Sequence, residues 1–247
     1  MLNTGIIGLG WWGKTLVKAA RDFGVPLRFV RGVTLEPETV LDFAAEQQIA
    51  LGTSLDEVLA DKSIQAVALA TPHTQHRAQV EAIAAAGKHL YCEKPFALSK
   101  ADAEAALDAC RRAGIVIAVG HHFRLMPSMR VLAELKEAGA FGTVMHAEGN
   151  YSHDWLANYP SDIAIFGENC RAESVSETRA IVRHAGKEPE VVDRPTDNHL
   201  GRNLDHFAKA AMGQGKFPIP PDGILQTTAA LEAVFKSVDA NGAWMIV

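Results

Sequence analysis

Three closely spaced glycines near the start of the chain constrain its fold more than any other feature. Gly8, Gly10 and Gly13 follow a short apolar run at residues 4–7 and precede residues 14–23, whose apolar side chains recur at helical spacing. A strand that turns into a helix through this G-x-G-x-x-G pattern presents unpaired backbone N–H groups where phosphates bind. The first glycine permits the tight turn, the second lets the backbone approach a pyrophosphate, and the third lets the helix pack closely on the strand. An ordinary left-handed turn is the structural alternative.

The segments around the loop decide between these alternatives, because strands alternate with helices there. Apolar or β-branched runs predict further strands, and the stretches between them predict helices. The expected strands are residues 27–34, 66–70, 89–92 and 115–119, and the expected helices are residues 37–48, 54–59, 75–86 and 101–113. Such alternation is typical of βαβ units in a parallel sheet with helices on both faces. We therefore predict an α/β fold whose first domain, residues 1–121, is a doubly wound Rossmann sheet that holds a dinucleotide.

The second half of the chain has a different character, because short strands follow one another directly. We expect strands at residues 144–151, 163–166, 172–175 and 179–184, and helices at residues 129–138, 204–212 and 225–238. Strands in succession without intervening helices favour an antiparallel sheet. Residues 122–247 are therefore predicted to form a smaller α+β domain with a mainly antiparallel sheet, and residues 186–190 a solvated turn or linker.

Composition argues against several other classes of protein. Hydrophobic residues make up 48% of the 247 positions, charged residues make up 21%, and the formal net charge of −5 gives no reason to expect nucleic acid. No apolar run is long enough to span a bilayer and no signal-peptide pattern opens the chain, so we expect a cytoplasmic protein with no membrane partner. The three cysteines lack CxxC spacing, which argues against a disulfide framework. None of the ten histidines belongs to an HExxH motif, and the adjacent His121 and His122 cannot both face one point on a strand, so we expect no metal.

The residues after the second strand bear on which dinucleotide would bind. An acidic residue about 20 positions beyond the glycines usually binds the ribose of NAD. Thr34 stands there and lacks the charge that would repel the 2′-phosphate of NADP, whereas Glu36 nearby favours NAD. The choice between NAD and NADP is therefore open. Trp11 and Trp12, inside the loop, would either wall the phosphates or the substrate cleft, or pack on a domain interface.

Further motifs follow the ends of the later strands, where open α/β sheets bind ligands. The segments GIIGLGWWG, TPHTQH (71–76), EKPFALS (93–99) and VGHHFRLMP (119–127), in this order, resemble the Gfo/Idh/MocA family of oxidoreductases. The resemblance covers the first domain and continues weakly beyond it. It implies a Rossmann domain followed by an α+β domain whose open sheet carries the substrate and often forms an oligomer interface. It also implies hydride transfer between NAD or NADP and a sugar, cyclitol or related hydroxy compound.

The resemblance assigns roles to single residues. It places Lys94 near the nicotinamide and the reacting hydroxyl, where an ammonium would stabilise negative charge on oxygen and relay a proton; the alternative is a solvated surface lysine. Pro95 resembles a proline that is often cis in the family. His76 would either touch the nicotinamide side of the cofactor or only cap a helix turn. The loop, the ribose position and the motifs together give these cofactor-binding candidates: Gly8, Gly10, Trp11, Trp12, Gly13, Thr34, Glu36, Thr71, Pro72, His73, His76, Glu93 and Lys94.

The second domain departs from the family pattern. His121, Arg124 and His153 are the candidate substrate-binding residues, although an interdomain salt bridge is an equal alternative for Arg124. The domain is shorter than the family's, and the helix whose Asp and His partner the lysine is not found, so a deletion near Asp162–Ile163 is the simplest explanation. A shortened sheet leaves an edge or face to be covered, which favours a homo-oligomer through the C-terminal sheet.

Two functions are compatible with these observations. The first is an NAD(P)-dependent dehydrogenase or reductase that acts on the CH–OH groups of a sugar or polyol, with Lys94 as its catalytic residue. The alternative is a catalytically impaired nucleotide-binding or oligomerising protein derived from such an enzyme. The intact glycine loop and Glu-Lys-Pro segment favour the enzyme, and the missing Asp/His helix favours the alternative.

Overall fold

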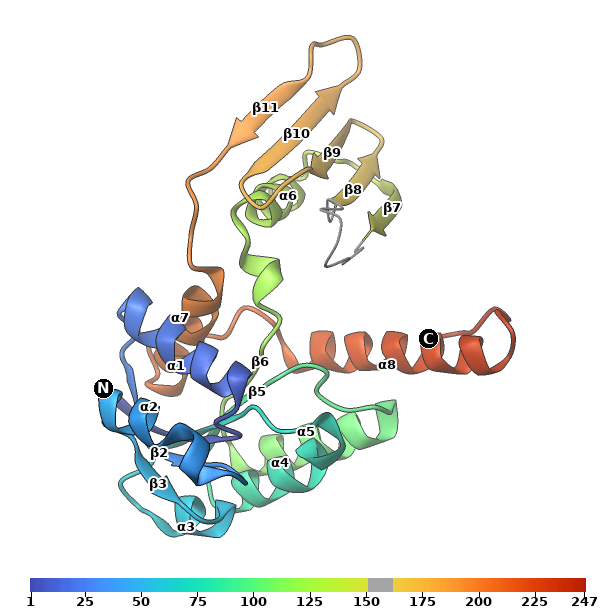
Figure 1. The fold of residues 1–247 in the computed structure, drawn as a ribbon. Helices are drawn as coiled ribbons and strands as arrows, with labels where there is room; N and C mark the ends of the chain where they lie inside the picture. The colour runs from blue at the N-terminus through green and yellow to red at the C-terminus, as the bar shows by residue number, and fades with distance from the viewer. Residues whose placement is uncertain (151–161) are drawn as a thin grey trace. The chain divides into compact units, whose positions relative to one another are not determined.

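The computed structural model describes residues 1–150 and 162–247, which form two compact units (Figure 1). Unit 1 consists of Met1–His121 together with Leu200–Val247, and unit 2 is His122–His199. This grouping differs from the division expected from the sequence, which assigned all of residues 122–247 to the second domain. The physical reason is that apolar residues of the first C-terminal helix and of the start of the second are buried in the cores of the first unit.

Unit 1 is built on a six-stranded parallel sheet with the strand order β3-β2-β1-β4-β5-β6. Its strands are β1 (Leu2–Ile7), β2 (Leu27–Val33), β3 (Ala50–Gly52), β4 (Ala66–Leu69), β5 (His89–Cys92) and β6 (Ile117–Val119). All four residues of β4 are buried, as a strand covered by helices on both faces requires. The predicted Rossmann sheet is confirmed. The edge strand β3 was not predicted.

Helices cover both faces of this sheet. On one face α1 (Trp11–Phe23), α2 (Leu41–Glu46) and α7 (His199–Ala211) share a core with the strands, and on the other face lie α3 (Leu55–Ala60), α4 (His76–Ala85), α5 (Lys100–Ala113) and α8 (Pro221–Asp239). Phe207 of α7 packs on Tyr91 of β5, with ring centroids 5.7 Å apart. The helix expected at residues 37–48 is instead a 3₁₀ turn, η1 (Pro37–Val40), followed by the short α2. A second 3₁₀ turn, η2 (His73–Gln75), precedes α4.

Unit 2 contains a five-stranded antiparallel sheet with the order β11-β10-β9-β8-β7. Its strands are β7 (Val144–Asn150), β8 (Asp162–Gly167), β9 (Cys170–Ser174), β10 (Arg179–His184) and β11 (Glu190–Asp193), and they follow η3 (His122–Leu125) and α6 (Pro127–Glu137). The antiparallel sheet is confirmed, but β11 begins at the end of the segment expected to be a linker. Val131 and Leu132 of α6 are buried on one face of the sheet. The predicted assembly of copies through this sheet stays a prediction.

The opposite face of the unit 2 sheet carries both charged and aromatic side chains. Glu173 of β9 accepts from Arg171 at 2.6 Å and from Arg183 of β10 at 2.9 Å. The Arg171 guanidinium also lies 4.6 Å from the ring centroid of Phe166. In the part of the chain that the structure describes, no helix combines the length and apolarity needed to cross a bilayer.

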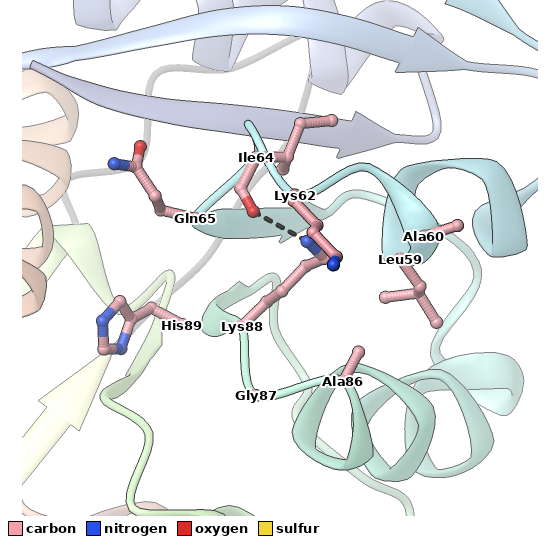
Figure 2. A pocket seen from close by; sticks show the side chains of 9 residues that line it. All are labelled: Leu59, Ala60, Lys62, Ile64, Gln65, Ala86, Gly87, Lys88 and His89. Carbon is pink, nitrogen blue, oxygen red and sulfur yellow. Dashed lines mark hydrogen bonds between the residues drawn. The ribbon is translucent and has the colours of Figure 1, made fainter.

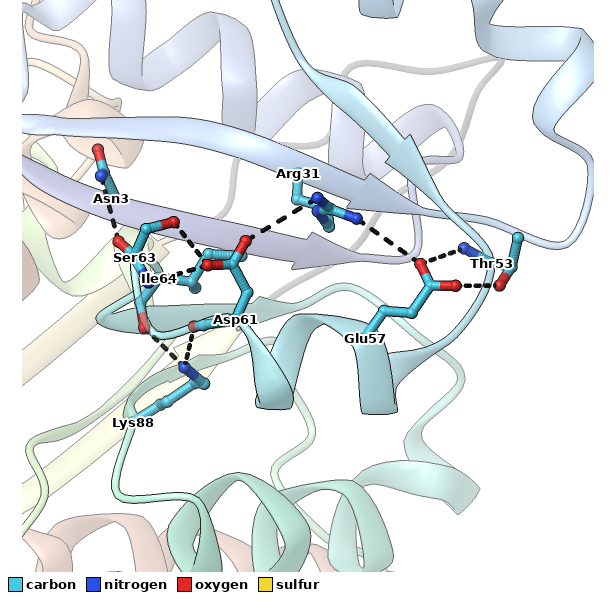
Figure 3. Close-up of polar contacts among 8 residues, drawn as sticks. All are labelled: Asn3, Arg31, Thr53, Glu57, Asp61, Ser63, Ile64 and Lys88. Atoms are coloured by element: carbon cyan, nitrogen blue, oxygen red, sulfur yellow. Dashed lines mark hydrogen bonds and ion pairs between the residues drawn. The ribbon is translucent and has the colours of Figure 1, made fainter.

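A network of ion pairs and hydrogen bonds connects segments of unit 1 near the start of β4 and β5 (Figure 3). Arg31 of β2 lies 3.7 Å from the Glu57 carboxylate and 3.9 Å from that of Asp61. Lys88 is buried and donates from Nζ to the carbonyl oxygens of Asp61, at 2.8 Å, and Ile64, at 2.7 Å. Its ammonium therefore ties the chain that precedes β5 to the loop that precedes β4.

We predict that Lys88→Met lowers the free energy of unfolding by about 2 kcal/mol, because two carbonyl groups lose a buried donor. Urea unfolding followed by circular dichroism measures this change. Lys62→Met is the matched control, since Lys62 is an exposed lysine in the loop that precedes β4, and its cost should stay within about 0.5 kcal/mol. Equal stability of the two variants would show that the Lys88 bonds do not contribute.

Candidate functional site

The glycine loop lies where the sheet topology leaves room for a ligand. The chain passes from β1 to β2 on one side and later returns to β4 on the other side of β1. Connections that leave in opposite directions diverge at such a switch point, and open α/β sheets bind ligands there. Backbone bonds join the strand ends, from the Gly8 N–H to Val33 O and from the Ala70 N–H to Ile7 O, both at 2.8 Å.

The three glycines of the loop have different geometries. Gly8 has a φ of +93°, and a Cβ there would lie 2.4 Å from Ala70 O. A Cβ on Gly13 would lie 2.1 Å from Gly8 O, so the first turn of α1 touches the loop backbone. Gly10, at the N-cap of α1, has an ordinary φ of −75°, and a Cβ there would meet no described atom within 4 Å. The backbone around the loop therefore requires glycine at positions 8 and 13, whereas the protein leaves open space at Gly10.

Lys94 lies against the glycine loop rather than pointing away from it. Its side chain is exposed and Nζ lies 5.6 Å from the ring centroid of Trp12. Trp12 is half-buried and packs on the core beneath α1, whereas Trp11 is 78% exposed. The centroids of the two indoles are 5.3 Å apart. The peptide bond between Lys94 and Pro95 is cis.

The Glu93 carboxyl is buried next to Lys94 and Trp12. Its residue is only 5% exposed, and the Lys94 backbone N–H donates to Oε2 at 3.3 Å. Burial raises the pKa of Glu93, and the interactions with the Trp12 side chain and the Lys94 N–H partly oppose that rise. A Cβ on Gly120 would lie 2.5 Å from Oε1, so a larger residue at this position would require the carboxyl to move. Gly120 was not among the predicted site residues, although a glycine directly after a buried strand is a signal that could have found it.

His76 joins two of the loops at this edge of the sheet. It is buried, with Nδ1 2.9 Å from Pro95 O and Nε2 3.0 Å from Thr71 O. Burial lowers the pKa of His76 and the carbonyl contacts oppose that change. Carbonyl oxygens of the protein therefore lie within hydrogen-bonding distance of both ring nitrogens, and the role of His76 toward a cofactor stays a proposal. The Thr71 hydroxyl donates to Gln79 Oε1 at 2.6 Å, a partner that the sequence did not indicate.

The remaining cofactor-binding candidates lie on the same edge. Thr34 directly follows β2 and is half-buried, and Glu36 is exposed before η1. Pro72 and His73 are exposed in the segment after β4. These positions stay proposals, because the geometry places them beyond strand ends without showing what they contact.

The candidate substrate residues are divided between the units. His121 is the last residue of this part of unit 1, and its N–H donates to Val119 O at 2.7 Å. Arg124 is exposed in η3 of unit 2. His153 lies outside the described residues. Within residues 1–150 and 162–247, no three His, Cys, Asp or Glu side chains are grouped so that they could hold a metal ion.

A pocket opens at the opposite edge of the unit 1 sheet, where β4 and β5 begin (Figure 2). Lys88 lines it, but its ammonium already binds two carbonyl groups. The helices α3 and α4 both end beside it, and the carbonyl groups of helix C-termini disfavour anions. The pocket therefore does not suit a pyrophosphate. Its lining residues are Leu59, Ala60, Lys62, Ile64, Gln65, Ala86, Gly87, Lys88 and His89.

Comparisons with known proteins agree with the Rossmann fold of unit 1. Residues 2–121 match the family model GFO_IDH_MocA, described as an oxidoreductase family with an NAD-binding Rossmann fold. Levoglucosan dehydrogenase of Pseudarthrobacter phenanthrenivorans is 32% identical over 171 residues, which cover 66% of this chain and 44% of that protein. The 2,7-anhydro-N-acetylneuraminate hydratase of Escherichia coli is 30% identical over 145 residues, covering 59% of this chain and 38% of that protein. The matches therefore span less than half of these curated relatives.

Solved structures show the same fold at low identity. A levoglucosan dehydrogenase in complex with NADH and levoglucosan superposes with a TM-score of 0.87 at 17% identity, covering 99% of this chain and 98% of that one. A protein from Desulfitobacterium hafniense, described as a putative NADPH-dependent oxidoreductase, gives a TM-score of 0.82 at 16% identity, covering 97% and 96%.

The buried Glu93 carboxyl leads to a prediction about pH. Because its pKa is raised in the folded state, the unfolded chain loses this proton first as the pH rises above about 4.5, the ordinary value. Folding then becomes less favourable until the folded carboxyl has also ionised. Glu93→Gln lacks this titration. We therefore expect the unfolding free energy of Glu93→Gln, relative to the unmodified chain, to increase with pH across this window and then to level off.

Urea unfolding of both proteins at a series of pH values from 4 upward measures this difference. A difference that does not change with pH would show that the carboxyl titrates alike in the folded and unfolded states.

Proposed function

Because the chain belongs to the Gfo/Idh/MocA family of NAD-binding oxidoreductases, we propose that it transfers a hydride between a nicotinamide cofactor and a hydroxyl or carbonyl group of a sugar, cyclitol or related compound. The observation that carries the proposal is the open space before Gly10, at the N-terminus of α1 and at the switch point of the sheet. No other part of unit 1 combines these features among the residues that the structure describes.

The residues of unit 1 would hold the cofactor along this edge. Backbone N–H groups of the loop and of the first turn of α1 would bind the pyrophosphate, where the helix dipole favours negative charge. Thr34 and Glu36 would lie toward the adenosine ribose, and Thr71, Pro72 and His73 would line the segment after β4. The bound nicotinamide supplies or accepts the hydride. NADH and NADPH both remain candidates, since Thr34 is uncharged and Glu36 is acidic.

Lys94 is proposed as the catalytic residue of the reaction. An alcohol that loses a hydride must also lose its hydroxyl proton, and negative charge develops on the oxygen. The Lys94 ammonium is exposed at the loop and can stabilise that charge and exchange a proton with solvent. The names of the relatives support a sugar substrate: they include a levoglucosan dehydrogenase, a 1,5-anhydro-D-fructose reductase and a D-apiose dehydrogenase. Their variety leaves the particular sugar to be found by screening.

We expect Gly10→Val to fold but to bind cofactor at least tenfold more weakly, because the side chain would occupy the space proposed for the pyrophosphate. Titration with NADH and, separately, NADPH, followed by tryptophan fluorescence, measures the affinity and identifies the preferred cofactor. Gly13→Ala is the contrasting variant: its Cβ would collide with backbone, so it should lose about 2 kcal/mol of stability. Unchanged affinity in folded Gly10→Val, or no binding of either cofactor by the unmodified chain, would overturn the proposal.

Replacing the lysine separates binding from chemistry. Lys94→Met should keep the cofactor affinity within about threefold and lower kcat by about 10²- to 10⁴-fold, the range for a lost proton-transfer group. A screen of sugars and polyols that includes levoglucosan and D-apiose supplies the substrate for this assay. Lys62→Met, at the opposite edge of the sheet, is the control. Full turnover in Lys94→Met would remove Lys94 from the mechanism.

A further inference from the structure

The Trp12 indole interacts with one acidic and one basic side chain. On one side is the buried Glu93 carboxyl, whose pKa the Trp12 side chain lowers. On the ring face is the exposed ammonium of Lys94, 5.6 Å from the centroid. The ring itself packs on the core of unit 1. Gly120 lies close to the Glu93 carboxyl on another side. A rigid, half-buried side chain therefore lies between two consecutive residues of the Glu-Lys-Pro segment.

We infer that Trp12 is a positioning residue for Lys94: the indole, fixed by the core and by Glu93, holds the Lys94 ammonium over its face at the glycine loop. This inference rests on the proposed function for its catalytic meaning, but the contact itself can be tested without it. A lysine side chain has four rotatable bonds and an exposed one samples many conformations, so a fixed aromatic face limits where the ammonium lies. Trp gives the strongest cation–π contact of the aromatic residues.

The inference gives Glu93 a role that is also positional. The indole N–H is the only donor of a Trp side chain. The ring quadrupole is negative on the faces and positive at the edge, so the indole can offer its face to an ammonium and its N–H edge to a carboxyl oxygen. The second indole of the loop, Trp11, is exposed. Within the described residues, the contacts to Glu93 and Lys94 are made by Trp12 and not by Trp11.

The contact is tested first on Lys94 itself. Acetic anhydride at low excess acetylates only unprotonated amines, and peptide mass spectrometry gives the rate at Lys94 relative to Lys62 in the same molecule. Trp12→Leu should raise the relative rate at Lys94 by about 2- to 5-fold, the equivalent of an exposed cation–π contact. Trp12→Phe keeps an aromatic face and should stay closer to the unmodified rate. Trp12→Met replaces the leucine variant if that one does not fold.

The catalytic meaning is tested with the substrate found in the screen. Trp12→Leu should lower kcat by about tenfold while KM for the cofactor changes by less than threefold, and Trp12→Phe should restore most of the loss. Trp244→Leu is the matched control for removing a tryptophan, because Trp244 is fully exposed near the chain end and outside the site. Its kcat and its KM for the cofactor should both be unchanged.

Two results would overturn the inference. Unchanged acetylation of Lys94 in Trp12→Leu would show that the indole does not hold the ammonium. A kcat in Trp12→Phe as low as in Trp12→Leu would show that the aromatic face does not matter and that Trp12 acts only by filling volume. A chain that binds neither NADH nor NADPH would instead defeat the proposed function, and the acetylation rates would still decide whether Trp12 holds Lys94.

Discussion

The close approach of α1 to the ends of β1 and β4 is the constraint on which the rest of the site depends. Gly13 lies so near Gly8 O, and Gly8 so near Ala70 O, that a single added Cβ at either place would overlap backbone. Backbone cannot yield as a flexible side chain can, so these two contacts fix the start of the helix relative to the sheet. The N–H groups of the first helical turn are thereby held at one point above the strand ends, with open space before Gly10.

The two edges of the unit 1 sheet stabilise charges of opposite sign for one physical reason. Parallel βαβ units bring helix N-termini to the edge where strands end and helix C-termini to the edge where strands begin. At the second edge α3 and α4 end, and the buried Lys88 ammonium is met by carbonyl groups. At the first edge α1 begins, and the buried Glu93 carboxyl is met by a backbone N–H. The same polarity suits the first edge to a pyrophosphate and the second to a lysine.

The sequence predicted those parts of the fold that leave a local periodic signal. The buried run of β4 and the glycine loop were both found, because burial on both faces and a strand-to-helix turn each impose a recognisable pattern. The three-residue β3 and the exposed β11 were missed, since short edge strands need little apolar patterning. The return of residues 200–247 to unit 1 could not be predicted either. A helix pattern shows which side chains are apolar but not which core receives them.

In the candidate site, too, the sequence predicted the local motifs but not the contacts between distant segments. Glycine spacing and the Glu-Lys-Pro segment are readable along the chain, whereas the meeting of Trp12, Glu93 and Gly120 joins three distant segments and appears only in three dimensions. All three belong to unit 1, within the residues that match the family. On the proposed function, the lysine and its support are therefore built with the cofactor domain.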